Sequence, residues 1–243
     1  MTVQRPAWYT VSGHGVLADL VNLLHPPYTL WHLSYVLIGI GLAPVIHPDR
    51  SIAVVIAFFL GLGIGAHALD ETMGNPLKTR LSKKKLYQIG FSSLAAAATI
   101  GAYYVVTLSY LLLPIILVEV FLAIMYNLET FNKRFHNVMV FSISWGVLPF
   151  ITGYFVNALS LSLGAVLASL AIGLLTYVQR TLSLQARTVR RTIDSPVSAL
   201  KLENGEEIRL STTDLIAPAE KSLKALTLTI LIFAIALIIQ RVF

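Results

Sequence analysis

The sequence contains no cysteine, and only 12% of its 243 residues are charged. Without cysteine, the chain has neither a disulfide framework nor a thiolate metal site. Soluble domains carry about 25% charged residues, whereas hydrophobic residues make up 56% of this chain. The composition therefore argues against an ordinary soluble domain and predicts an integral membrane protein.

Several catalytic motifs are also missing. The chain has no His-Glu-x-x-His motif, no Walker-type glycine loop and no Gly-x-Ser-x-Gly motif, so common metalloprotease, nucleotide-hydrolase and serine-hydrolase classes have no support. The net charge of +6 would suggest nucleic acid in a soluble protein. Here the positive-inside rule explains it, and we expect no nucleic-acid partner.

Long apolar stretches predict the fold class, an all-α, polytopic transmembrane helical bundle. A spanning helix needs roughly 20 mostly apolar residues, and the alternating segments of a membrane β-barrel are missing. About seven stretches qualify: 28–47, 51–70, 88–107, 109–126, 137–157, 160–179 and 222–240.

Lysine and arginine are concentrated in the connections after the second, fourth and sixth predicted helices. The connections on the opposite side contain only Arg50, and the C-terminal end adds Arg241. The positive-inside rule then predicts a multi-pass protein of the cell (cytoplasmic) membrane, with the N-terminus in the cytoplasm and the C-terminus outside.

The long polar segment before the last predicted helix has internal structure. The stretch LQARTVRRTID predicts a basic amphipathic helix that could lie on lipid headgroups. Asn204-Gly205, flanked by alternating residues, predicts a small cytoplasmic β-hairpin. The expected organisation is a cytoplasmic N-terminal segment, a six-helix transmembrane core, this amphipathic helix with its hairpin, and a last transmembrane helix, at 1–27, 28–181, 182–221 and 222–243.

The first candidate site follows the second predicted helix, in LDETMGNPLKTRLSKKK. On a helix, His67, Asp70 and Glu71 share one face. Asp70 and Glu71 are candidate catalytic residues and candidate ligands of Mg²⁺, which shares oxygen ligands with substrate phosphates. Lys78 and Arg80 could then clamp a diphosphate. The alternative is that both acids only cap the helix and pair with the cations that follow.

The second candidate site precedes the fifth predicted helix. Its residues Asn132, Lys133, Arg134, His136 and Asn137 form a denser polar group than a topological signal requires. They are candidate phosphate-binding residues, and the alternative is that the cationic pair only sets the orientation of the helix.

Glu119 lies about halfway along the fourth predicted helix. An acid at that depth is costly, which makes it a functional hypothesis by default. Together with His67 it is a candidate intramembrane polar site. It could carry a proton, or simply form a hydrogen bond to a neighbouring helix.

The order of these features resembles the UbiA superfamily of intramembrane prenyltransferases. That family's first helix is similar to LLHPPYTLWHLSYVLIGIGLAP, and the end of its first aspartate-rich motif is similar to LDETMGNPLKTRLS. Its motif with a Lys-Arg start and a Trp-Gly-x-x-Pro helix resembles NKRFHNVMVFSISWGVLPFITGY. The resemblance covers about residues 20–195 and rests on order and topology.

The resemblance implies a helical bundle with a cavity open to lipid, in which Mg²⁺ assists ionisation of a prenyl diphosphate. The prenyl group then passes to a lipid or aromatic acceptor. Asp70 matches the last acid of the first motif, whereas Thr181 and Gln185 replace the acids of the second. Arg187 and Arg190 lie nearby and are expected to bind the diphosphate directly.

The leading hypothesis is therefore a UbiA-like prenyltransferase, an enzyme that transfers an alkyl group and binds prenyl diphosphate or membrane lipid. The alternative is a non-catalytic membrane subunit, or a lipid- or quinone-binding scaffold, that docks a protein partner through residues 182–221. A transporter is a third and weaker hypothesis, because no repeated pair of broken helices is evident.

Overall fold

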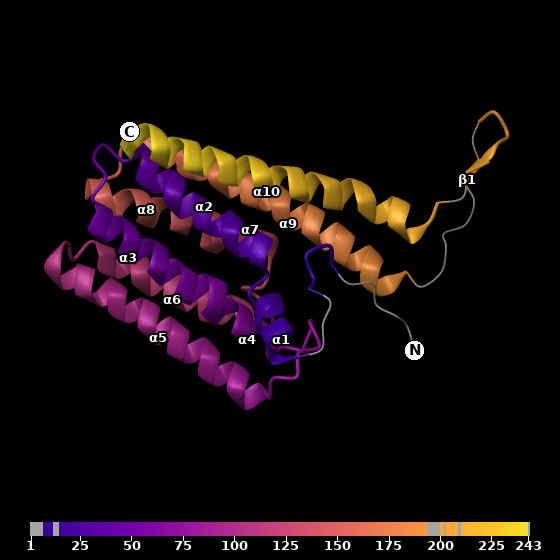
Figure 1. The fold of residues 1–243 in the computed structure, drawn as a ribbon, viewed down its shortest axis with the longest axis horizontal. Coiled ribbons are helices and arrows are strands. Elements are labelled where there is room, and N and C mark those ends of the chain that lie inside the picture. The colour runs from indigo at the N-terminus through magenta and orange to yellow at the C-terminus, as the bar shows by residue number, and fades with distance from the viewer. Residues whose placement is uncertain (1–6, 12–14, 194–199, 202, 209, 243) are drawn as a thin grey trace.

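The computed structural model of the chain describes residues 7–11, 15–193, 200–201, 203–208 and 210–242. Long helices that run side by side dominate this part of the chain (Figure 1). The all-helical class expected from the sequence is confirmed. Five helices among the described residues are long and apolar enough to cross a membrane: Pro48–Glu71, Lys83–Thr107, Val138–Ala158, Leu163–Thr192 and Thr212–Arg241.

Two further apolar helices are shorter than a typical span. Helix α2 (Pro26–Leu42) has 17 residues and α6 (Leu112–Asn127) has 16, against roughly 20 for a typical spanning helix. The expected count of seven spans is therefore not shown by helix length. A short helix, α1 (Val16–Leu23), precedes α2 in the expected N-terminal segment.

Two of the long helices contain a π-helical segment. One consists of α3 (Pro48–Phe58), η1 (Phe59–Ala66) and α4 (His67–Glu71). The other consists of α7 (Val138–Ser142), η2 (Ile143–Val147) and α8 (Leu148–Ala158). Segments of this kind are frequent at functional sites. In the second helix, Pro149 lacks an N–H and would clash with a regular preceding turn, which explains the irregular stretch before it.

The remaining long helices are α5 (Lys83–Thr107), α9 (Leu163–Thr192) and α10 (Thr212–Val242). The boundaries of the last two differ from those expected. Residues 182–192 contain no Gly or Pro, so the basic stretch continues α9 instead of forming a separate amphipathic helix. The helix α10 begins at Thr212, ten residues before the expected residue 222. At its start, Ser211 Oγ accepts a hydrogen bond from the Asp214 amide, and Asp214 Oδ2 accepts one from the Ser211 amide at 2.8 Å, a reciprocal capping arrangement.

Within the residues that the structure describes, the strands form one short antiparallel pair, β1 (Leu200–Lys201) and β2 (Glu207–Ile208). Gly205, with φ 86°, lies in the connecting turn. An isolated two-stranded hairpin is marginally stable at best, even when longer, so the expected β-hairpin is not established as a folded unit. Figure 1 places the pair beyond the ends of the bundled helices, and the expected hairpin residues 197–199, 202 and 209 lie outside the described residues.

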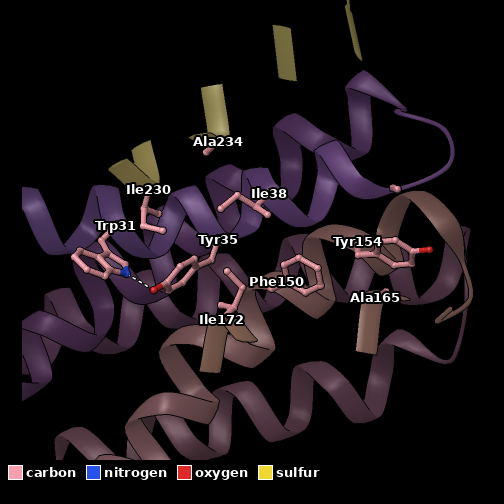
Figure 2. Packing of buried hydrophobic residues seen from close by; sticks show 10 residues of the cluster. Trp31, Tyr35, Ile38, Phe150, Tyr154, Ala165, Ile172, Ile230 and Ala234 are labelled. Atoms are coloured by element: carbon pink, nitrogen blue, oxygen red, sulfur yellow. Dashed lines mark hydrogen bonds between the residues drawn. The ribbon is translucent and has the colours of Figure 1, made fainter. Parts of the chain in front are cut away.

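The main hydrophobic core surrounds α2, which packs against α8 and α10. Figure 2 shows Trp31 and Tyr35 of α2 close to Ile172 of α9 and Ile230 of α10. The Trp31 Nε1–H group donates a hydrogen bond to the Tyr35 hydroxyl, so both polar groups are satisfied in the core. Gly153 allows α8 to approach α2, because a Cβ there would overlap the Val36 carbonyl; small residues serve this purpose in membrane helix pairs.

Candidate functional site

A group of arginines lies on α9 where this helix approaches α4, α6 and α7. Helix α9 contributes Thr176, Arg180, Ser183 and Arg187, spaced three or four residues apart and therefore on one face. Arg180 is 8% exposed and Ser183 is 7% exposed. The face continues beyond the buried part of the helix through Arg190 and Arg191; we call these four arginines the α9 arginine stripe.

Arg180 is held by aromatic rings. Its guanidinium lies 4.8 Å from the ring centroid of Phe141 and 6.0 Å from that of Tyr126, within the range of cation–π attraction. No ion pair to a carboxylate is recorded for Arg180 within the part of the chain that the structure describes. A buried cation without an anionic partner is costly, so this position is set up to receive an anion.

The hydroxyl of Tyr126, whose ring lies 6.0 Å from the Arg180 guanidinium, is buried and has no hydrogen-bond partner among the described residues. Buried polar groups are nearly always satisfied in native proteins, so a polar ligand or ordered water is expected at this cluster.

Asp70 is the acid associated with this cluster. Its carboxylate interacts electrostatically with Arg180, Arg191 and Tyr126, yet no direct ion pair joins it to an arginine within the described ranges. Asp70 thus contributes a negative charge to a predominantly cationic cluster.

Aromatic residues from the N-terminal part of the chain lie at the same end. The rings of His25 and His67 are 4.6 Å apart, and Tyr9 contacts both His25 and Tyr28. Burial among these groups lowers the pKa of His25 to about 3, with a smaller contribution from His67. The Tyr28 hydroxyl lies 3.4 Å from Ser183 Oγ, which connects these rings to the helix that carries the arginine stripe.

Glu71 does not face the same way as Asp70. It is 1% exposed, and its carboxylate accepts hydrogen bonds from the Leu77 amide at 3.1 Å, the Thr79 amide at 3.2 Å and the Thr79 hydroxyl at 3.1 Å. These contacts hold the loop between α4 and α5. The geometry favours the alternative in which Glu71 is structural.

The two cations expected to clamp a diphosphate beside Asp70 lie on that loop. Lys78 and Arg80 are exposed, and Lys78 has a positive φ of 57°. The Arg80 amide donates to Asp19 Oδ2 at 3.1 Å, which ties the loop to α1. No recorded hydrogen bond or ion pair among the described residues brings the Lys78 side chain to the arginine stripe.

The second predicted cluster is also largely outside the buried site. Asn132, Lys133 and Arg134 are exposed, and Lys133 forms an ion pair with Glu129 at 2.7 Å. The Asn137 side chain accepts the Val140 amide at 2.9 Å and so caps α7. The exception is His136.

The His136 ring stacks on Tyr126 with 4.4 Å between centroids. Its Nδ1 lies 3.0 Å from the Tyr126 carbonyl. His136 thereby supports the aromatic wall beneath Arg180.

The predicted arginines of α9 have different surroundings. Arg190 forms an ion pair with Glu220 of α10 at 2.5 Å, whereas no ion pair is recorded for Arg187 among the described residues. Arg187 is therefore the better candidate to act with Arg180 on a bound anion.

The expected intramembrane pair, His67 and Glu119, is not brought together by any recorded contact. His67 Nδ1 lies 3.0 Å from the Gly63 carbonyl of its own helix. Glu119 accepts a hydrogen bond from the Thr152 hydroxyl at 2.5 Å. The two side chains have separate partners and belong to different parts of the bundle.

The donor set at Asp70 does not fit a two-carboxylate Mg²⁺ site, because three loop donors occupy Glu71. Among the described residues, no group of three or more His, Asp or Glu side chains is placed to hold a metal ion. The expected Mg²⁺ therefore stays a prediction, with Asp70 as its remaining candidate ligand from that pair.

The sequence reasoning missed Arg180, Tyr126 and His25 as site residues. Arg180 had a readable signal, since it lies one turn after Thr176 and two turns before Arg187 on the same helical face. Tyr126 had none, because its position beside Arg180 depends on the packing of α6 against α7. Comparisons with protein-family models, with curated proteins and with solved structures find no match.

Proposed function

We propose that this protein is a UbiA-like intramembrane protein that binds a prenyl diphosphate at the end of the bundle containing the arginine stripe. The observation that carries the proposal is Arg180, which is buried beside two aromatic rings and has no carboxylate partner recorded among the described residues. Arginine suits phosphate because its planar guanidinium donates bidentate hydrogen bonds and stays charged.

The proposal includes a membrane arrangement. We propose that α2 and α6 also span, which makes seven spans, and that the arginine stripe faces the cytoplasm. The N-terminus is then cytoplasmic and the C-terminus lies outside. Support comes from the cationic connections, which all fall on one side of such a path. The segment around β1 and β2 would be the cytoplasmic hairpin region.

The proposed chemistry is transfer of the prenyl group to a lipid or aromatic acceptor. The allylic C–O bond breaks, the diphosphate leaves with the electron pair, and the acceptor forms the new bond and loses a proton. Arg180 and Arg187 would stabilise the negative charge that grows on the leaving diphosphate, the interaction that dominates such reactions. The rings of Tyr126 and Phe141 would fix the orientation of Arg180.

The experiment is binding of labelled farnesyl diphosphate to the purified protein in nanodiscs, with and without Mg²⁺, beside Asp70→Asn. Saturable binding that unlabelled diphosphate ester competes away supports the proposal. If Mg²⁺ strengthens binding and Asp70→Asn removes only that gain, Asp70 is a metal ligand. A wild-type protein that binds no more farnesyl diphosphate than empty nanodiscs would refute the proposed function.

A second candidate is a membrane subunit that docks a protein partner through residues 182–221. It is favoured by the way α9 and α10 continue together past the shorter helices (Figure 1), joined by the cluster of Ala186, Ile216 and Ala219. Deletion of 197–212 separates the candidates. The subunit would lose a co-purifying protein, whereas prenyl diphosphate binding would persist in the enzyme.

A further inference from the structure

A second potential site lies between α3, η1, α5, α6 and α8, away from the arginine stripe. It is a cavity of about 110 Å³, and a cavity near this size accommodates one aromatic ring. Small side chains leave the space open. Six of the lining residues are alanine or glycine: Ala57, Gly61, Ala97, Ala98, Gly101 and Ala123.

Most of the cavity lining is apolar, and its polar side chains are Arg50, Tyr104, Glu119, Ser144 and Thr152. Glu119 and Thr152 both line it. The Thr152 hydroxyl donates to Glu119 Oε1 at 2.5 Å, and Glu119 Oε2 has no recorded partner among the described residues. One carboxyl oxygen is therefore available to a ligand in a mostly apolar space, in which Arg50 already donates to the Val156 carbonyl.

The chemistry of a carboxyl group identifies the ligand class. An ionised carboxyl accepts hydrogen bonds, and a protonated one both donates and accepts. A hydroxyl group is a donor and an acceptor, so it matches Glu119 in either state. A cation would need more than one acid, and a diphosphate would be repelled by the carboxylate. A ligand with an apolar skeleton and one hydroxyl group can fill the cavity and form a hydrogen bond with Glu119.

The cavity is separate from the arginine stripe. Trp145 lines the cavity and stacks on Phe141, with ring centroids 5.2 Å apart and planes 7° from parallel. Arg180 lies over Phe141. This aromatic pair divides the anion site from the cavity.

We propose that this cavity is a binding site for an apolar alcohol or phenol, whose hydroxyl group hydrogen-bonds Glu119. Thr152 orients the carboxyl group, and the small residues of η1 and α5 surround the skeleton. In this proposal an alkyl tail on the ligand extends toward the outer surface of α5 and α6, where Tyr103, Val106 and Leu117 are exposed. The site does not depend on the proposed prenyl transfer.

The test uses tritiated 4-octylphenol and its methyl ether, 4-octylanisole, with the protein in phosphatidylcholine nanodiscs and empty nanodiscs subtracted. In the ether a methyl group replaces the hydroxyl hydrogen, so its oxygen can accept a hydrogen bond but cannot donate one. Because a neutral hydrogen bond contributes about 1 kcal/mol, wild type should bind the phenol roughly 3- to 10-fold more tightly than the ether.

Variants then locate the site. Glu119→Leu should abolish the preference for the phenol, and Glu119→Gln, whose amide still donates and accepts, should keep it with the fold preserved. Ala97→Leu should weaken both probes by filling the space. Thr99→Val is the matched control, because Thr99 is exposed on α5 and bonds only its own helix at the Ala95 carbonyl.

Three results would overturn the proposal. They are equal binding of phenol and ether by wild type, a phenol preference that survives in Glu119→Leu, and an Ala97→Leu protein that binds both probes as wild type does. Loss of the preference in a folded Glu119→Gln protein would contradict the hydrogen-bond argument in the same way.

Discussion

Replacement of Glu71 separates a structural acid from a metal ligand. In Glu71→Ala, the Leu77 and Thr79 amides and the Thr79 hydroxyl lose their acceptor. Leaving a buried donor unsatisfied costs about 1–3 kcal/mol, and Asn75 Oδ1 offers Thr79 a second acceptor. We therefore expect a loss of roughly 3–5 kcal/mol in the free energy of unfolding. Glu71→Gln loses one acceptor oxygen and should cost roughly 1–2 kcal/mol.

The assay is amide hydrogen exchange, read beside thermal unfolding in detergent. Glu71→Ala should speed exchange across residues 72–82 before the helices around α2 are affected, because the carboxylate holds that loop. Glu129→Gln is the matched control, since its acid forms a partly exposed ion pair with Lys133, worth little to stability. An unchanged loop and melting temperature in Glu71→Ala, together with lost Mg²⁺-dependent ligand binding, would refute the structural role.

Two other predictions concern stability. Gly153→Ala forces a Cβ against the Val36 carbonyl and should lower the free energy of unfolding by roughly 1–3 kcal/mol. Gly164→Ala is the control and should leave it unchanged, because a Cβ there meets nothing nearer than Ser162 Oγ at 3.8 Å. Equal melting temperatures of the two variants would contradict the close α2–α8 packing. Burial lowers the pKa of His25 to about 3 in the folded protein. Below about pH 6.5 the unfolded chain therefore binds a proton at His25 that the folded protein does not, which destabilises the fold. Stability should therefore be full above pH 6.5 and fall by roughly 1–2 kcal/mol from pH 7 to pH 5; a pH series of melting temperatures checks this, and His25→Phe should remove that part of the slope.

The sequence predicts well the features that depend on a single helix, such as its position and its first turn. Apolar length located the helices, and Pro26 and Pro48 lie at the first turns of α2 and α3, as proline at a helix start predicts. The boundaries of α9 and α10 differ from the expected ones because charged residues do not end either helix. Residues 182–192 remain helical, since arginine, leucine, alanine and glutamine favour helix regardless of the membrane edge.

The candidate site was harder to predict because it depends on packing between helices. Asp70 and Glu71 are neighbours in sequence, yet the loop at residues 77–79 occupies one of them. Lys78, Lys133 and Arg134 matched a phosphate pattern but are exposed. Arg180 follows the predicted sixth helix, where a cation also fits the positive-inside rule, and its place over Phe141 follows from the contact of α7 with α9.

The most direct test of the central claim is the affinity of farnesyl diphosphate for wild type, Arg180→Gln and Lys84→Gln in nanodiscs. Lys84 is exposed at the start of α5, so its variant removes the same charge outside the site. Truncating one side of a buried charge pair costs about 2–5 kcal/mol. The account predicts that Arg180→Gln binds at least roughly 30-fold more weakly and that Lys84→Gln binds as wild type does. Equal losses in a folded Arg180→Gln and in Lys84→Gln, or no loss in either, would contradict it.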